Sequence, residues 1–243
     1  MRSPSTPSAR RRLFCLPNAG GGTAVFSGWS KLLGPDVEVC CLLLPGRENR
    51  FRERSFERMP ELVPAIAEGM RDYLDKPFSF FGHSLGGIIS FELVRYFRSH
   101  GRSTPDHLFV SSARAPQLPN PFSRILSLPE PEFVEEVGRR YGAIPEEVLA
   151  DEELRRLTLP MLRADFSVFE TYEYSDGPPL ECAIFAFGGQ QDSMVSRESL
   201  EAWREQTRGA FTARLLPGGH FYLRDERLRL LGRVRELLNS NGI

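Results

Sequence analysis

The chain has 243 residues and a formal net charge of −1, from 31 Lys+Arg and 32 Asp+Glu. This length suits one α/β domain with a sizeable core, and 41% hydrophobic with 26% charged residues excludes a wholly disordered chain. The near-neutral charge provides no global basic field for a nucleic acid, and no run of about 18 apolar residues predicts a membrane span.

The N-terminus is basic and rich in serine and proline, and the apolar run that follows is too short for a secretory signal. We therefore expect a flexible tail at residues 1–12 and a single domain at 13–243. The cysteines are Cys15, Cys40, Cys41 and Cys182. All four lie in apolar, strand-like runs without metal-ligand spacing, which favours reduced thiols and a cytoplasmic location.

Short apolar runs alternate with stretches of helical periodicity, which predicts an α/β fold with a parallel sheet covered by helices. The expected strands are Leu13–Leu16, Val37–Leu44, Phe78–Phe81, His107–Ser111, Cys182–Phe187 and Phe211–Leu216. The expected helices around them are Met59–Leu74, Leu85–His100, Ser199–Gln206 and Arg224–Leu238. Most of the strands are apolar at every position, as expected when both faces of a sheet are buried.

The stretch 114–174 breaks this alternation. It has no strand signal and shows two helical patterns, Glu130–Tyr141 and Glu146–Tyr172. Crossover loops usually run roughly 2–6 residues, so we expect a helical insertion over one edge of the sheet, placed as a lid. Its aromatic residues are interpreted mainly as packing, with some of them lining an acyl channel. They are Phe133, Tyr141, Phe166, Phe169, Tyr172 and Tyr174.

A possible nucleophile lies where an expected strand runs into an expected helix. Here the sequence reads Gly82-His83-Ser84-Leu85-Gly86, which matches the G-x-S-x-G nucleophile elbow. The glycines allow neighbouring segments to close around a strained serine, and the helix N-terminus directs its N–H groups toward Ser84. The motif alone also occurs in ordinary glycine-rich turns, so its strand-and-helix context carries the assignment.

A serine nucleophile needs a base, and the chain has four histidines. His83 adjoins the serine, so its side chain should diverge from the nucleophile. His100 and His107 flank the loop at the far end of the following helix. His220 remains, just after the last expected strand, and it is the predicted general base.

The third residue should be an acid between the serine and the histidine in chain order. Asp192 directly follows the strand Cys182–Phe187 and is the predicted partner of His220. Asp165 and Asp176 belong to the insertion or its exit, and we expect them to be solvated or paired along a helix.

An oxyanion hole needs two backbone N–H groups directed at the developing charge. Leu85, the residue after the nucleophile, should supply one of them. The glycine-rich loop 17–22 should supply the other from Ala19, because its glycines let the main chain approach a substrate carbonyl closely. A phosphate-binding loop is the competing interpretation, but the sequence has neither a P-loop lysine nor G-x-G-x-x-G here.

A run of arginines precedes the first long helix. They are Arg47, Arg50, Arg52, Arg54 and Arg58, and acidic residues separate them. We interpret this run as a solvated loop, with a docking patch for an acidic partner as the alternative.

These residues alone predict an α/β-hydrolase that transfers acyl groups through an acyl-Ser84 intermediate. His220 acts as base, Asp192 fixes the imidazole tautomer, and Ala19 and Leu85 hold the oxyanion. This chemistry requires no metal and no organic cofactor. It does not distinguish ester, amide and thioester substrates.

Six segments match the motifs of a known enzyme family in sequence and spacing. They are Leu16–Gly21, Leu44–Glu48, Phe81–Gly87, Leu159–Asp165, Gly188–Asp192 and Pro217–Tyr222. In them the chain resembles the type II (stand-alone) thioesterases that accompany polyketide synthases and nonribosomal peptide synthetases, from Leu13 to about Leu238. Generic esterases lack the Leu-Arg-Ala-Asp stretch of the insertion. Asn18 departs from the pattern, because many relatives have an aromatic residue or histidine there.

The resemblance implies the α/β-hydrolase fold and removal of aberrant or stalled acyl groups from the phosphopantetheine arm of acyl or peptidyl carrier proteins. A chain-releasing thioesterase, or another serine esterase or acyltransferase of this fold, remains open. So does a non-catalytic carrier-protein-binding module, although the intact triad counts against it.

Overall fold

The computed structural model of the protein describes residues 8–142 and 150–239. Its centre is a six-stranded sheet with strand order β2-β1-β3-β4-β5-β6, in which all neighbours are parallel. The strands are β1 (Arg11–Leu16), β2 (Val37–Cys41), β3 (Phe78–His83), β4 (His107–Ser111), β5 (Ala183–Gly189) and β6 (Phe211–Leu216). The predicted parallel α/β sheet is thereby confirmed.

Both faces of the sheet are buried, as the continuous apolar runs predict. Successive side chains of a strand point to opposite faces, so Leu13 and Phe81 join one hydrophobic cluster while Phe14 and Phe80 join the other. The edge strand β6 differs because its burial alternates, with Thr212 and Arg214 exposed.

Seven helices accompany the sheet in the described residues, together with short 3-10 turns. They are α1 (Trp29–Leu33), α2 (Met59–Gly69), α3 (Leu85–Ser99), α4 (Glu130–Tyr141), α6 (Glu152–Glu170), α7 (Arg197–Glu201) and α8 (Arg227–Asn239). Helices α2 and α3 pack together on one face, and α1 and α8 pack together on the other. None of the helices in the described ranges has the length and apolar character needed to cross a bilayer.

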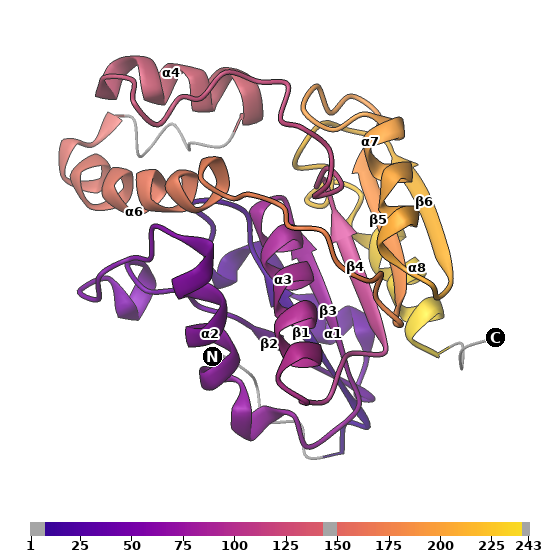
Figure 1. Cartoon of the computed structure of the whole chain (residues 1–243). Coiled ribbons are helices and arrows are strands. Elements are labelled where there is room, and N and C mark those ends of the chain that lie inside the picture. The colour runs from indigo at the N-terminus through magenta and orange to yellow at the C-terminus, as the bar shows by residue number, and fades with distance from the viewer. Residues whose placement is uncertain (1–7, 143–149, 240–243) are drawn as a thin grey trace.

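Helices α4 and α6 lie together beyond the carboxyl ends of the strands, above the first turn of α3 (Figure 1). They share a small hydrophobic cluster in which Phe133 and Phe166 meet edge to face at 5.4 Å. The Asp151 side chain caps α6 by accepting hydrogen bonds from the first turn. The predicted helix Glu146–Tyr172 matches α6 in its later part, and its first residues lie outside the described ranges.

Several boundaries differ from the expected ones. Strand β1 begins at Arg11, inside the segment 1–12 expected to be a tail, because Arg12 is buried and its guanidinium donates to Glu38 of β2 at 2.9 Å. Residues 1–7 of that segment lie outside the described ranges. Strand β2 ends at Cys41 rather than Leu44, and α2 ends at Gly69 rather than Leu74. All four cysteines are free thiols.

The strand order places a topological switch in the middle of the sheet. From β1 the chain moves outward to β2, then returns to form β3 on the other side of β1. The loops that leave β1 and β3 therefore diverge, and open α/β sheets bind ligands in the crevice formed there.

The first turn of α3 sits directly on the end of β1. A Cβ at Gly86 would lie 2.2 Å from the Leu16 carbonyl oxygen, a main-chain atom that cannot rotate away. We expect Gly86→Ala to lower the free energy of unfolding by about 1–3 kcal/mol, because overpacking forces the backbone to move. Chemical denaturation of the variant measures this loss.

The matched control is Gly69→Ala at the exposed end of α2, where an added Cβ meets nothing within 4 Å. This variant should gain about 0.4–1 kcal/mol, because alanine restricts the unfolded chain. Equal stabilities of the two variants would contradict the proposed close packing of α3 on β1.

Candidate active site

Ser84 occupies the sharp turn between β3 and α3, as its motif predicts. Its backbone has φ 55° and ψ −120°, and its N–H donates to the Ser111 carbonyl oxygen of β4 at 2.7 Å. A Cβ at Gly82 would lie 2.1 Å from the Gly86 carbonyl oxygen, so only glycine fits there. The turn thus holds the serine in a strained conformation at the N-terminus of α3.

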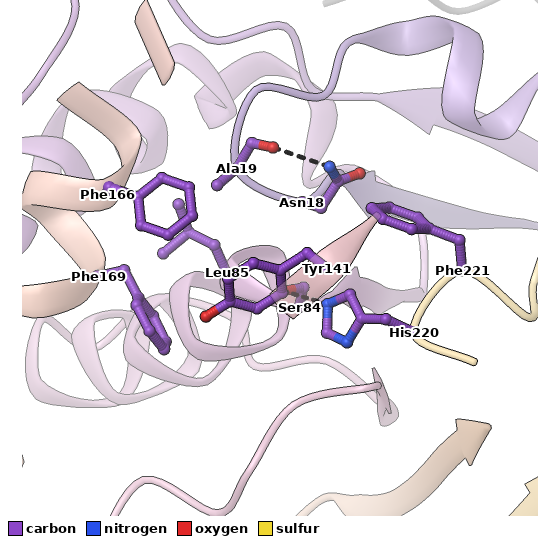
Figure 2. Close-up of a pocket in the computed structure, with 9 residues that line it drawn as sticks. All are labelled: Asn18, Ala19, Ser84, Leu85, Tyr141, Phe166, Phe169, His220 and Phe221. Carbon is purple, nitrogen blue, oxygen red and sulfur yellow. Dashed lines mark hydrogen bonds between the residues drawn. The ribbon is translucent and has the colours of Figure 1, made fainter. Parts of the chain in front are cut away.

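The structure brings His220 and Asp192 to this serine. The Ser84 hydroxyl lies 3.0 Å from His220 Nε2 (Figure 2), and His220 Nδ1 lies 2.9 Å from Asp192 Oδ2. The Asp192 side chain is fully buried, and its Oδ1 accepts a hydrogen bond from the Met194 N–H at 2.9 Å. With Nδ1–H donating to the carboxylate, Nε2 is left as the acceptor for the serine proton.

The loop after β1 lies opposite the serine, and its amides are held in place. Asn18 Nδ2 donates to the Ala19 carbonyl oxygen, and the Gly21 N–H donates to the Asn18 carbonyl oxygen at 2.9 Å. Within the described residues, no acceptor is found for the Ala19 N–H. The N–H of Leu85, the first residue of α3, has no acceptor within its helix. Both predicted donors are therefore available at the pocket.

A pocket opens at the serine, and Figure 2 shows its lining. The aromatic residues Tyr141 of α4 and Phe166 and Phe169 of α6 form one wall, and Tyr141 meets the His220 ring edge to face at 5.2 Å. Burial raises the pKa of Tyr141 to about 12, so its hydroxyl is neutral at physiological pH. A second pocket shares Ser84, Tyr141, Phe169 and His220 with the first.

The expectations for Asp165 and for Arg47 as solvated charges are wrong. Arg47 lies in the segment that follows β2, and Asp165 lies on α6. Their side chains are only 5% and 4% exposed. Arg47 Nη1 and Nη2 donate to the two carboxylate oxygens at 2.9 and 2.7 Å. The solvated interpretation holds for the neighbours Arg52, Arg54 and Arg58, which are exposed.

A further polar network lies beneath the histidine and was not predicted. The His83 ring is fully buried, and its Nδ1 is hydrogen-bonded to Ser111 Oγ at 3.0 Å. Ser111 Oγ is in turn hydrogen-bonded to the Tyr222 hydroxyl at 2.8 Å. Burial, and then the nearby His220, lower the pKa of His83 well below its usual value. His83 therefore remains neutral and packs under His220, their ring centroids 5.4 Å apart.

No group of three or more His, Cys, Asp or Glu residues within 8–142 and 150–239 has the arrangement of a metal site.

Fold and site geometry define an α/β-hydrolase with a serine at its nucleophile elbow. The Thioesterase domain family model matches residues 11–238, and the chain belongs to this family. It is thus a serine thioesterase of the α/β-hydrolase fold, which confirms the family predicted from its motifs.

The chain is similar to several individual proteins of this kind. It is 44% identical to the gramicidin S biosynthesis protein GrsT of Aneurinibacillus migulanus, over 92% of this chain and 87% of GrsT. The solved structure of RedJ, a thioesterase of prodiginine biosynthesis in Streptomyces coelicolor, matches with a TM-score of 0.88 at 35% identity, over 97% of this chain and 88% of RedJ. BorB, the type II thioesterase of the borrelidin cluster, matches with a TM-score of 0.84 at 34% identity, over 98% and 94%.

The buried, neutral His83 makes stability depend on pH. The usual histidine pKa is 6.5, so below that pH the unfolded chain binds a proton that the folded protein does not. Stability should therefore fall as the pH drops from 7 to 5. The His83→Asn variant should lose less over this range, by up to about 1.4 kcal/mol per pH unit.

Unfolding free energies at several pH values measure these slopes. His100→Asn is the control, since His100 is exposed at the end of α3. If the His83 and His100 variants had the same pH slope as the wild type, His83 would not be the group responsible.

Proposed function

We propose that this protein is an editing thioesterase, which hydrolyses aberrant or stalled acyl groups from the phosphopantetheine arm of acyl or peptidyl carrier proteins. The observation that carries this proposal is the hydrogen-bonded series Ser84–His220–Asp192 at the pocket of a thioesterase-family fold. Ser84 is the nucleophile, His220 the general base and Asp192 the residue that orients the imidazole. Ala19 and Leu85 form the oxyanion hole.

Acylation begins when Ser84 Oγ attacks the thioester carbonyl carbon. His220 Nε2, 3.0 Å away, accepts the serine proton, and Asp192 stabilises the resulting imidazolium. The carbonyl oxygen becomes an oxyanion that accepts hydrogen bonds from the Ala19 and Leu85 amides. Collapse of this intermediate breaks the carbon–sulfur bond and releases the pantetheine thiol, which takes its proton from His220.

Deacylation repeats these steps with water. His220 Nε2 takes a proton from the water as it attacks the acyl-serine carbon, and then returns that proton to Ser84 Oγ. The aromatic wall of Tyr141, Phe166 and Phe169 offers apolar surface to an acyl chain at this point. We assign the segment 114–174, which carries these residues, as a lid on the single domain 13–243.

The carrier-protein substrate is supported by the relatives. GrsT, RedJ and BorB are described as proteins of gramicidin S, prodiginine and borrelidin biosynthesis, and BorB as a type II thioesterase. Their similarity to this chain extends over nearly all of its length, which supports a role for this protein in a biosynthetic pathway of the same kind. We place the enzyme in the cytoplasm, in keeping with its four free thiols.

The role of Asp192 predicts a large effect of an isosteric change. Asp192→Asn should lower kcat about 10⁴-fold, because an amide favours the wrong imidazole tautomer and no longer stabilises the cation. Steady-state hydrolysis of an acyl-coenzyme A thioester measures this loss. Ser84→Ala provides the background rate and should also fail to react with a serine-directed phosphonate. A loss under about tenfold in Asp192→Asn would mean that another carboxylate fills this role.

A substrate panel tests the editing function itself. The same acyl groups are presented on a carrier protein, on coenzyme A and as simple oxygen esters, and kcat/KM is measured for each. We expect the order carrier protein, then coenzyme A, then oxygen ester, with short or incorrect acyl groups preferred to the finished product chain.

Two outcomes would contradict this proposal. Preference for the full-length product would indicate a chain-releasing thioesterase, and equal or faster cleavage of oxygen esters would indicate a general esterase. In both cases Ser84→Ala should remain inactive, so the catalytic assignment is tested separately from the substrate.

A further inference from the structure

We propose that Arg47 and Asp165 are positioning residues for the oxyanion hole, and that they link the loop carrying the Ala19 amide to helix α6. This inference rests on the proposed role of the Ala19 N–H as an oxyanion donor. It assigns a function to a buried ion pair that contacts neither Ser84 nor His220.

The two terminal nitrogens of Arg47 and the two carboxylate oxygens of Asp165 form hydrogen bonds either with each other or with the loop that carries Ala19. Asp165 Oδ2 accepts the Gly20 N–H at 2.7 Å and Arg47 Nη1 at 2.9 Å, while Oδ1 accepts Arg47 Nη2 at 2.7 Å. Arg47 Nη1 also donates to the Gly21 carbonyl oxygen at 2.9 Å. The ion pair is therefore hydrogen-bonded to two consecutive residues of the loop, to the Gly20 N–H and to the Gly21 carbonyl oxygen.

Peptide planarity carries this constraint to Ala19. The Ala19 carbonyl and the Gly20 N–H belong to one peptide plane, and both are hydrogen-bonded, to Asn18 Nδ2 and to Asp165. The Asn18 carbonyl and the Ala19 N–H belong to the preceding plane, whose carbonyl accepts from Gly21 N–H. Because C=O and N–H of a trans peptide point in opposite directions, fixing that carbonyl fixes the direction of the Ala19 N–H.

The same contacts tie the loop to α6. Gly20 has φ 73°, and a Cβ there would lie 2.7 Å from Leu162 Cδ1, one turn before Asp165 on the same helix. Since Leu162 packs on Gly20 and Asp165 binds its N–H, the position of α6 determines that of the loop. A displacement of α6 would withdraw the acceptor from the Gly20 N–H and leave the donor next to it less well oriented.

The test compares two inhibitors that differ only in their need for an oxyanion hole. An alkylthio trifluoromethyl ketone, R–S–CH2–CO–CF3, accepts Ser84 Oγ at its carbonyl carbon and forms an oxyanion, with the serine proton held on His220. The matching thioether, R–S–CH2–CH2–CF3, has a methylene in place of the carbonyl and binds the same pocket without forming an oxyanion. Both are measured on the full chain with Asp165→Asn and, because removal of a buried charge can impair folding, with Arg47→Lys.

We expect kcat to fall about 10- to 10²-fold in both variants, less than the 10²–10³-fold of a donor removed outright. Ketone inhibition should weaken by a similar factor, while KM and thioether affinity stay within about twofold. The pH profile of kcat/KM should keep its shape, because His220 and Asp192 are unchanged. The control is Arg12→Lys, a comparably buried arginine paired with Glu38 at 2.9 Å at the other end of β1, which should leave both inhibitors unaffected.

Two results would overturn the inference. One is wild-type kcat and ketone affinity in both variants. The other is an equal loss of ketone and thioether affinity, accompanied by a lower Tm, which would assign the pair a purely structural role. If Ser84→Ala is inactive and unlabelled while these variants behave like the wild type, the serine mechanism of the proposed function stands and only the positioning role fails.

Discussion

Main-chain contact between the turn after β3 and the end of β1 is the constraint on which the site depends. Gly86 lies so close to the Leu16 carbonyl oxygen that no side chain fits between them. The contact places the first amide of α3 beside the loop that follows β1. The segment with Ser84 and Leu85 and the loop with Ala19 therefore meet at this contact, and the histidine and the aspartate come to it from the ends of β6 and β5.

Much of this arrangement was predictable from the sequence, for identifiable reasons. Strands buried on both faces have continuous apolar runs, and the carboxyl ends of parallel strands meet at one edge. Ser84 and Asp192 each follow such a run, and His220 follows the alternating edge strand β6, so their meeting at one edge is a consequence of the sheet. Elimination among four histidines could single out His220 as the one close to the Ser84 hydroxyl, because the other three lie beside the serine in sequence or at the opposite edge of the sheet.

The ion pair of Arg47 and Asp165 could not be predicted in the same way. Its members are 118 positions apart, and neither adjoins a strand end that contributes to the triad. A charged residue in an arginine-rich loop is usually solvated, and nothing in its spacing showed that α6 would cover it. Tyr222 and Ser111, whose side chains are hydrogen-bonded, are likewise 111 positions apart, and no sequence pattern brings them together. Boundaries such as the start of β1 were also missed, since charged Arg11 and Arg12 conceal the strand.

The two proposed oxyanion donors are backbone groups, so the identity of the side chain at either position leaves them intact. A side-chain substitution at Ala19 or Leu85 that keeps the course of the backbone therefore leaves the charge-stabilising donors in place. Proline is the one common residue that lacks a backbone N–H, and it alone would delete a donor directly. Comparison of relatives by sequence would consequently underestimate how well this part of the catalytic apparatus is preserved.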